Sequence, residues 1–380
     1  MKEITCDELK SLPEDSYVLI DIRDEGLREY GMIPGAVSVP TEDLTDSKVL
    51  AEIDPDKKLI FYCEIGRMSL AIDDTMEVLE GKDCYSLSGG YVGYVRSGIS
   101  NEADKEEKRK KAEDSIQKKF HKQLFSPFAR ACKTYKLIEE GDKIAVCISG
   151  GKDSMLMAKL FQEIKKHRQV EFDLTFLVMD PGYKPENRQL IESNAEALGI
   201  PITIFESTIF DTVDTIEKNP CYLCARMRRG YLYSKAKELG CNKIALGHHY
   251  DDVIETILMG MLHGAQIQTM MPKLHSTNFE GMELIRPLYF VRESDICAWR
   301  DYNDLHFLQC ACHFTDTCTT CHTDGTTSSK RLETKKLIAE LKKTNPFVES
   351  NIFRSMENVN LDTVIEYKQK GVRHNFLDEY

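Results

Sequence analysis

A run of six residues in the middle of the chain combines residue types that suit phosphate binding: Ser149-Gly150-Gly151-Lys152-Asp153-Ser154. Two glycines allow a tight turn and a close approach of the backbone to a ligand. The run precedes an amphipathic helical pattern, whose free N–H groups and dipole favour an anion. Lys152 adds positive charge, and Asp153 could hold Mg²⁺. The Walker pattern does not fit, because Asp153 stands where Ser or Thr is required. An ordinary Gly-Gly turn is the alternative.

Other polar residues follow later strand-like runs. Met179-Asp180 end one such run, and Gly247-His248-His249 follow another. Because the carboxyl ends of parallel strands meet at one edge of a sheet, we expect both groups beside the phosphate loop. Asp251 and Asp252 open the next helical pattern, where the dipole favours carboxylates. They could hold Mg²⁺ or only cap that helix.

Cysteines form a second set of candidates. Cys221 and Cys224 are separated by two residues and open a helical pattern, and a helix N-terminus lowers the pKa of a thiol. Their spacing suits a redox pair, half of a zinc site or part of an iron–sulfur cluster. Four more cysteines lie within twelve residues and could form a closed zinc site of their own: Cys310, Cys312, Cys318 and Cys321.

Cys63 opens a six-residue loop between a strand-like run and a helical pattern. Backbone N–H groups of such a loop can surround the sulfur and stabilise a persulfide anion. A catalytically silent loop used only for docking is the alternative.

The elements that must position these residues alternate along the chain, which predicts an α/β fold with a parallel sheet covered on both faces. A charged stretch over 101–119 marks a boundary between two such regions. The predicted domains are 1–102, a charged linker or helix start at 103–118, 119–345 and a C-terminal extension at 346–380. The expected strands are 17–22, 59–62, 144–148, 172–179, 202–205 and 243–246, and the expected helices are 68–79, 154–167, 185–198, 222–239 and 251–262.

Composition bounds the class of protein. The chain has 380 residues, a net charge of −12 and 13 Cys. No run approaches the ~20 apolar residues of a membrane span, and the first residues do not read as a signal peptide. We therefore expect a cytoplasmic protein whose cysteines serve metal or sulfur chemistry. Residues 1–100 hold 10 Lys+Arg against 21 Asp+Glu, whereas the remainder is close to neutral. Basic clusters within 105–122, 226–229 and 330–343 could follow nucleic-acid phosphates or be solvated helix faces.

The phosphate loop resembles the signature of the PP-loop ATP pyrophosphatases. Further motifs, Pro220 to Arg226, Leu246 to Asp252 and Arg286-Pro287-Leu288, resemble the tRNA 2-thiocytidine synthetase family over about 113–345. The resemblance implies ATP cleavage between the α and β phosphates, adenylation of a base oxygen and its replacement by sulfur in tRNA. It also implies that the ATP-binding residues are Ser149, Gly150, Gly151, Lys152, Asp153, Ser154, Met179, Asp180, Gly247 and His248.

The same resemblance favours a [4Fe–4S] cluster held by Cys221, Cys224 and Cys310, with one iron open for a hydrosulfide. The sequence departs from the family here, because Cys310-Ala311-Cys312 replaces two cysteines separated by two residues. Cys312 is therefore an alternative third ligand. A local Zn²⁺ site formed with Cys318 and Cys321 is the competing interpretation.

Residues 1–100 resemble a rhodanese domain. The resemblance rests on Asp21-Ile22-Arg23, on residues 31–36, on the Cys63 loop and on Leu87-Ser88-Gly89-Gly90. Two positions depart from the pattern, since Arg67 is fifth rather than sixth in the loop and Met32 replaces a frequent His. The resemblance implies that Cys63 carries persulfide sulfur to the cluster.

Together these features predict an ATP-dependent, tRNA-thiolating sulfurtransferase with ATP, Mg²⁺ and a [4Fe–4S] cluster. The predicted catalytic residues are Cys63, Lys152, Asp153, Asp251 and Asp252. The predicted partners are tRNA and a sulfur donor such as a cysteine desulfurase or a small persulfide; no membrane is expected, and a homodimer stays open. The alternatives are a sulfurtransferase for another tRNA base or a small molecule, and a non-catalytic sulfur carrier or sensor.

Overall fold

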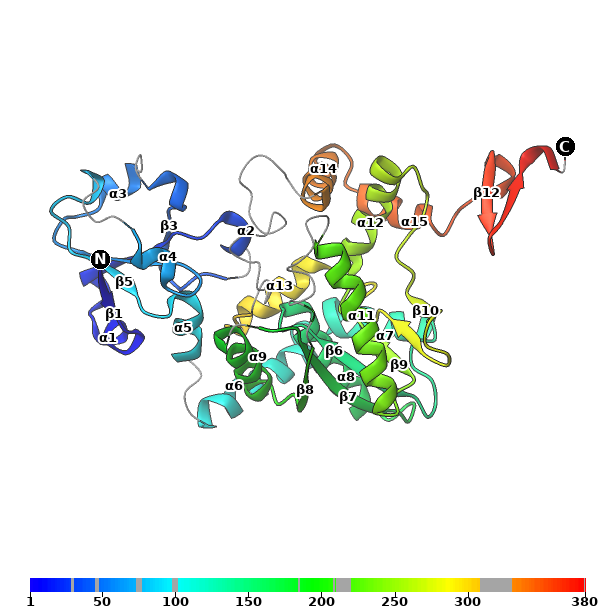
Figure 1. Ribbon diagram of the computed structural model, residues 1–380, viewed down its shortest axis with the longest axis horizontal. Coiled ribbons are helices and arrows are strands. Elements are labelled where there is room, and N and C mark those ends of the chain that lie inside the picture. Colours follow the sequence, from blue (N-terminus) through cyan, green and yellow to red (C-terminus); the bar gives the residue numbers. More distant parts are fainter. Residues whose placement is uncertain are drawn as a thin grey trace. The chain divides into compact units, whose positions relative to one another are not determined.

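The structure is a computed structural model that describes residues 1–28, 31–44, 48–72, 77–97, 102–183, 185–207, 209, 220–307, 330–378 and 380 (Figure 1). It has two compact units. The first comprises Met1–His249 and Pro272–Thr327, and the second comprises Tyr250–Met271 and Ser328–Tyr380. In the part of the chain that the structure describes, no helix is long and apolar enough to cross a membrane.

The first unit begins with a five-stranded parallel sheet in the order β1-β5-β4-β2-β3. The inner strands are runs of apolar residues, as expected for strands that are buried on both faces. The strands are β1 (Lys2–Ile4), β2 (Tyr17–Asp21), β3 (Val37–Ser38), β4 (Lys58–Tyr62) and β5 (Cys84–Leu87). The helices are α1 (Cys6–Ser11), α2 (Glu25–Arg28), α3 (Lys48–Glu52), α4 (Arg67–Leu70) and α5 (Gly90–Ser97).

The helix predicted over 68–79 is wrong in length, since α4 ends at Leu70. Met68 and Leu70 supplied part of the helical spacing, but both are exposed. Ile72 and Leu79 join the apolar core of this sheet without continuing the helix. Tertiary packing, and not a continuous apolar stripe, buries these side chains.

A six-stranded sheet follows in the order β10-β11-β9-β6-β7-β8. All neighbours are parallel except β10 and β11, which pair antiparallel at one edge. The strands predicted after residue 140 are confirmed, with bounds within a residue or two. The strands are β6 (Lys143–Ile148), β7 (Asp173–Asp180), β8 (Ile202–Glu206), β9 (Lys243–Ala245), β10 (Lys273–His275) and β11 (Glu283–Ile285).

Helices pack against this sheet and against one another. Alternate residues Ala145 and Cys147 of β6 join a core cluster with Tyr233 and Ala236 of α11, and α8 also packs against β6. Lys159 of α8 is buried and pairs with Glu113 of α6 at 2.7 Å, so the charged segment after the first sheet is fixed to α8. The helices are α6 (Glu102–Gln117), α7 (Ser126–Thr134), α8 (Lys152–Lys166), α9 (Pro185–Ala197), α11 (Pro220–Glu238) and α13 (Glu293–Tyr302).

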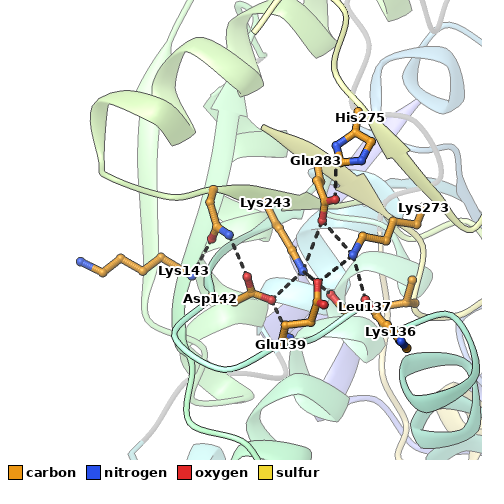
Figure 2. Close-up of polar contacts among 10 residues, drawn as sticks. Lys136, Leu137, Glu139, Asp142, Lys143, Lys243, Lys273, His275 and Glu283 are labelled. Carbon is orange, nitrogen blue, oxygen red and sulfur yellow. Dashed lines mark hydrogen bonds and ion pairs between the residues drawn. The ribbon is translucent and has the colours of Figure 1, made fainter. Parts of the chain in front are cut away.

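A buried ion-pair network closes the amino edge of this sheet (Figure 2). Lys243, the first residue of β9, is 2% exposed. Its Nζ lies 2.7 Å from Asp142, 3.1 Å from Glu139 and 3.3 Å from Glu283. Lys273 adds a second cation, 2.8 Å from Glu139 and 3.1 Å from Glu283. The paired charges make burial of Lys243 tolerable.

The second unit contains α12 (Tyr250–Gly264), α14 (Lys330–Thr344), α15 (Val348–Ser355) and a hairpin of β12 (Glu366–Gln369) and β13 (Val372–Asn375). The three helices pack on one another. Tyr250 stacks on Phe353 with ring centroids 4.7 Å apart, which joins α12 to α15. The hairpin is the C-terminal end of the unit (red in Figure 1).

Candidate functional site

The predicted phosphate loop connects β6 to α8 at the carboxyl edge of the six-stranded sheet. Gly150 has φ +87°, a conformation that residues with a side chain rarely adopt. The two serines close the loop, since the Oγ atoms of Ser149 and Ser154 are 3.2 Å apart and the Ser154 hydroxyl donates to the Gly151 carbonyl at 2.9 Å. The first N–H groups of α8 therefore end the loop in the arrangement that favours an anion.

Lys152 is 3% exposed and lies at the start of α8. Its Nζ is 3.1 Å from Oε1 of Glu293, which opens α13, and 3.2 Å from Oδ1 of Asp153. A buried cation held by two carboxylates can exchange one of them for a phosphate oxygen. The loop thus has a charged donor in place for a phosphate.

Asp153 is the residue of the phosphate loop that could hold Mg²⁺. Its Oδ1 atom is buried and accepts no hydrogen bond from any residue that the structure describes. Nε2 of His249 is 4.0 Å from the same oxygen. Lys152 pairs with this oxygen at 3.2 Å. Carboxylate oxygens are ligands that Mg²⁺ prefers, so Asp153 is a candidate ligand for this ion.

Gly247 follows β9 and lies against the loop. A Cβ added there would meet Ser154 N at 3.2 Å and the Asp153 carbonyl carbon at 3.3 Å, and both are backbone atoms. A side chain at this position would push the two segments apart by a few tenths of an ångström. His248 donates its N–H to the Leu246 carbonyl at 2.9 Å, and His249 is buried. The predicted juxtaposition of the segment after β9 with the phosphate loop is therefore observed.

Met179 and Asp180 end β7 at the same sheet edge and are both buried. Oδ1 of Asp180 accepts hydrogen bonds from the N–H groups of Gly182 at 2.9 Å and Tyr183 at 2.7 Å. Its Oδ2 pairs with Arg188 at 3.2 Å. In this structure Asp180 organises the turn that leaves β7, which shapes the edge next to the loop.

Asp251 and Asp252 lie in the first turn of α12, in the second unit. Asp252 forms an ion pair with Arg331 of α14, and the same guanidinium is 3.6 Å from Glu255. Within its own unit Asp252 therefore helps to join α12 to α14. The Mg²⁺-binding role expected of both residues stays a prediction.

The structure describes the backbone of two of the candidate cluster cysteines. Cys221 and Cys224 belong to the first turns of α11, as the sequence predicts, but the description gives nothing of their side chains. The other four predicted ligands, Cys310, Cys312, Cys318 and Cys321, lie outside the described residues. Among the described residues, no group of three or more His, Cys, Asp or Glu side chains could hold a metal ion.

The core cysteines behave as expected from their apolar surroundings. Cys132, Cys147 and Cys241 are buried, and burial raises the pKa of the Cys147 thiol to about 12. Burial also raises the pKa of Cys132 and Cys241. These thiols stay protonated at neutral pH and act as small apolar residues. Cys297 differs, because it is half-buried.

The Cys63 loop joins β4 to α4 at the carboxyl edge of the five-stranded sheet. Its Sγ accepts a hydrogen bond from the Gly66 N–H at 3.2 Å and lies 3.7 Å from the Ser69 hydroxyl. Gly90 contacts this loop so closely that an added Cβ would lie 2.4 Å from the Cys63 carbonyl oxygen. Where the sequence predicts several backbone donors around the sulfur, one N–H donates to it among the described residues, and the Ser69 hydroxyl lies beside it. Cys63 itself is 3% exposed.

A buried arginine fixes the position of this cradle. Arg23 forms a bidentate pair with Asp21 and contacts Glu64, the residue after Cys63, at 3.0 Å. Its guanidinium also lies 3.9 Å from the ring centroid of Tyr91, whose N–H donates to the Cys63 carbonyl. Burial alone would lower the pKa of Arg23, but Asp21 and Glu64 raise it. Arg23 is therefore a permanent cation beside the loop.

Two functional side chains were not identified from the sequence. Glu293 contacts Lys152 across 141 positions in the chain, and only its place in the first turn of a helix marks it as a candidate. Arg23 was noted as part of a motif, but its pairing with Glu64 depends on β2 and β4 being neighbours. Neither contact has a local signal.

Two separate regions of the chain match known protein families. The PP-loop domain family matches residues 114–313, and the rhodanese-like domain family matches residues 5–97. The chain is therefore a PP-loop protein with an N-terminal rhodanese-like domain, and both resemblances seen in the motifs are confirmed.

Relatives narrow this class. The tRNA-cytidine(32) 2-sulfurtransferase of Anaeromyxobacter sp. (strain K) is 31% identical over 244 residues, which cover 63% of this chain and 80% of that protein. The protein of that name from Aliivibrio fischeri (strain MJ11) is 40% identical over 195 residues, 50% of this chain and 63% of its own length. This chain belongs to the tRNA-cytidine(32) 2-sulfurtransferase family, and it is an enzyme of the sulfurtransferase class.

Among solved structures, the U34-tRNA thiolase NcsA from Methanococcus maripaludis with its [4Fe-4S] cluster aligns with a TM-score of 0.48 at 24% identity. The alignment covers 61% of this chain and 76% of that chain.

Proposed function

We propose that this protein thiolates a cytidine of tRNA at the expense of ATP. The observation that carries the proposal is the phosphate loop of a family of tRNA-cytidine sulfurtransferases, with a buried Lys152 and with Asp153 in the first turn of the helix that follows. The runner-up activities, thiolation of another tRNA base or of a small molecule, would use the same loop.

Adenylation supplies what the reaction needs, because a base carbonyl oxygen is a poor leaving group. The C2 oxygen attacks the α-phosphorus of ATP, the bond to the β-phosphate breaks and pyrophosphate leaves. A hydrosulfide, released when a thiol reduces the persulfide by two electrons, then attacks C2; AMP departs with the original oxygen, and loss of the sulfur's proton leaves the thiocarbonyl. Lys152 and the N-terminus of α8 stabilise the charge that develops on the phosphates.

Mg²⁺ would be held by Asp153, whose Oδ1 atom accepts no hydrogen bond from the described residues. Asp251 and Asp252 complete the proposed ligand set, and Ser149, Gly150, Gly151, Ser154, Met179, Asp180, Gly247 and His248 complete the proposed ATP site. Iron would be held as a [4Fe–4S] cluster by Cys221, Cys224 and Cys310, with Cys312 as the alternative third ligand. Such a cluster supplies an open iron for a hydrosulfide. A Zn²⁺ site that includes Cys318 and Cys321 is the alternative for the later cysteines.

Sulfur would arrive on Cys63 as a persulfide. The N–H of Gly66 donates to its sulfur at 3.2 Å, and the Ser69 hydroxyl lies 3.7 Å away. Arg23 keeps the loop in place through Glu64. The donor to Cys63 would be a cysteine desulfurase or a small persulfide. Because the substrate is tRNA, we place the protein in the cytoplasm.

The test is AMP release from labelled ATP by the anaerobically purified protein. We expect release to require tRNA, and mass spectrometry of the digested tRNA to show a thiolated cytidine. Release with a small molecule and no tRNA would favour the runner-up. Cys63→Ser should leave tRNA-dependent pyrophosphate release intact and lower both AMP release and sulfur incorporation; unchanged incorporation would assign the first domain to docking. If Lys152→Ala keeps thiolation in cells, the protein is a carrier or sensor and the proposal is wrong.

A further inference from the structure

His306 follows α13 and contacts the region of the five-stranded sheet, which belongs to the same compact unit. Its Nδ1 atom is 2.9 Å from the hydroxyl oxygen of Tyr91, a residue of α5 that lies 215 positions earlier in the chain. The two rings meet edge to face, with centroids 5.8 Å apart. The side chain of His306 is 16% exposed, so the contact is largely shielded from water.

The backbone of His306 is held by elements that pack around the six-stranded sheet. The buried Asn194 of α9 donates a side-chain N–H to the His306 carbonyl at 2.9 Å. The preceding residue, Leu305, donates its N–H to the Arg300 carbonyl at 3.0 Å, which closes the end of α13. His306 is therefore fixed on α9 and α13, and it reaches from there to a tyrosine of the first domain.

The hydrogen bonds of His306 have a defined direction. Burial raises the pKa of Tyr91, so its hydroxyl keeps its proton at neutral pH and donates to Nδ1. Nε2 of His306 is 3.1 Å from a carboxylate oxygen of Asp304, which accepts only. A neutral imidazole with its proton on Nε2 satisfies both partners. His306 thus acts as the acceptor that orients the Tyr91 hydroxyl.

Tyr91 in turn supports the Cys63 loop. Its N–H donates to the Cys63 carbonyl at 2.9 Å. Its ring lies over the guanidinium of Arg23, which pairs with Glu64 at 3.0 Å. A displacement of Tyr91 therefore reaches the loop by two routes, the backbone of Cys63 and the side chain of Glu64.

The Tyr91 hydroxyl is enclosed on a further side by Gly31. A Cβ added at Gly31 would lie 2.5 Å from the Tyr91 hydroxyl oxygen and 3.4 Å from Nδ1 of His306. The carbonyl of Gly31 also accepts a hydrogen bond from Arg23 at 2.7 Å. Three segments that are distant in the chain thus meet at one phenol, and one of them comes from the second domain.

We infer that His306 is a positioning residue for the Cys63 loop: it holds Tyr91, and through Tyr91 the backbone of Cys63, in the closed arrangement. The inference rests on the proposed function for the role of Cys63 as sulfur carrier. It assigns to the PP-loop domain a side chain that completes the rhodanese-like site. The domain that consumes the sulfur therefore helps to shape the loop that delivers it.

The first experiment measures how fast iodoacetamide alkylates Cys63 in the full chain, followed by mass spectrometry of the peptides. Cys63 is 3% exposed, so its alkylation reports opening of the loop. His306→Ala should speed the reaction roughly 5–10-fold, the effect of one lost hydrogen bond. His306→Asn should keep the wild-type rate, because its amide oxygen can accept from Tyr91 in place of Nδ1.

Cys84 is the internal control, since it is buried in the same sheet and its alkylation reports unfolding of the whole domain. Its rate should be the same in the wild type and in His306→Ala. An unchanged rate at Cys63 overturns the inference. Equal acceleration at Cys63 and Cys84 also overturns it, because His306 would then only stabilise the domain.

A double-mutant cycle tests whether His306 acts through the Tyr91 hydroxyl. Tyr91→Phe removes that hydroxyl but keeps the ring over Arg23 and the N–H that binds Cys63. It should speed alkylation of Cys63 as much as His306→Ala does. The double variant should be no faster than either single one, because all three lack the same hydrogen bond. Additive effects would show that the two side chains act independently, and would contradict the inference.

Sulfur transfer separates this inference from the proposed function. His306→Ala should lower sulfur incorporation into tRNA about fivefold and keep tRNA-dependent pyrophosphate release. Loss of pyrophosphate release in this variant would place His306 in the adenylation step and overturn its positioning role. A wild type without tRNA-dependent pyrophosphate release would instead contradict the proposed function, and the alkylation rates would still decide whether His306 positions the Cys63 loop.

Discussion

The two edges of the six-stranded sheet each bury a lysine among carboxylates, yet they differ in what those carboxylates can do. At the amino edge, Lys243 lies within 3.3 Å of Glu139, Asp142 and Glu283. At the carboxyl edge, Lys152 lies near Asp153 and Glu293. The two side chains are almost equally buried.

The difference lies in the backbone around each lysine. Lys243 begins a strand, and its partners form further hydrogen bonds, such as that from the Asn242 amide to Asp142 at 2.7 Å. Lys152 stands at a glycine-bearing turn before a helix N-terminus, where an anion can replace a carboxylate. A closed network contributes to stability, whereas an open one can bind a substrate. The following predictions test that contrast.

Lys243→Met should give the largest effect. It leaves three carboxylates near one another without their shared cation, which we expect to lower the free energy of unfolding by about 3–5 kcal/mol. Urea unfolding measures the change. AMP release per folded molecule should stay as in the wild type. Lys143→Met is the matched control, because this side chain is exposed and points away from the network. Equal losses from both variants would contradict the role of the network.

Lys152→Met should show the opposite profile. We expect AMP release to fall about 10²–10³-fold, roughly 3–4 kcal/mol of transition-state stabilisation. The free energy of unfolding should change little, since the cation is already held in an exchangeable pair. Lys165→Met, in the last turn of the same helix, is the control and should keep full activity. A Lys152→Met protein that unfolds easily would show that this edge is structural.

Glu293→Gln should have a smaller effect with a different sign. Its carboxylate holds Lys152 when no ATP is bound. Removing that charge should tighten ATP binding about fivefold, or about 1 kcal/mol, as measured by equilibrium binding. Asp295→Asn, in the same first turn of α13, should leave the affinity unchanged. Weaker binding in Glu293→Gln would mean that Glu293 contacts the nucleotide or its metal.

The smallest effect should come from Glu139, through the pH dependence of the free energy of unfolding. Hydrogen bonds from Lys273 and Lys243 lower the pKa of this carboxyl from 4.5 to about 2. A lowered pKa stabilises the fold above pH 4.5, and that contribution is lost as the pH falls toward 2. Glu139 is half-exposed, so the effect is screened. Glu139→Gln should therefore flatten the curve of unfolding free energy against pH between 4.5 and 2; an unchanged curve would show that the pair adds nothing.

Patterns among neighbouring residues were sufficient to predict the features that neighbouring residues form. The run from Ser149 to Ser154, the Cys63 loop and the strands after residue 140 could all be predicted, because turn glycines, helix starts and apolar runs are encoded by neighbouring residues. The helix predicted over 68–79 was wrong in length, because Met68 and Leu70 are exposed whereas Ile72 and Leu79 lie in the core of the first sheet after the helix has ended. The periodicity of apolar residues cannot distinguish a continuous helix from a short helix followed by separately buried side chains.

The sequence by itself thus determined the class of the protein, the phosphate loop, the Cys63 loop and the α/β alternation. Only the tertiary structure decided that Lys243 lies in a closed ion-pair network and Lys152 beside the phosphate loop. It also decided that Glu293 pairs with Lys152 and that Arg23 pairs with Glu64. These contacts join residues that are far apart in the chain or on neighbouring strands. Their energy depends on burial and on the order of strands in a sheet, which are properties of the folded chain and not of any short run of residues.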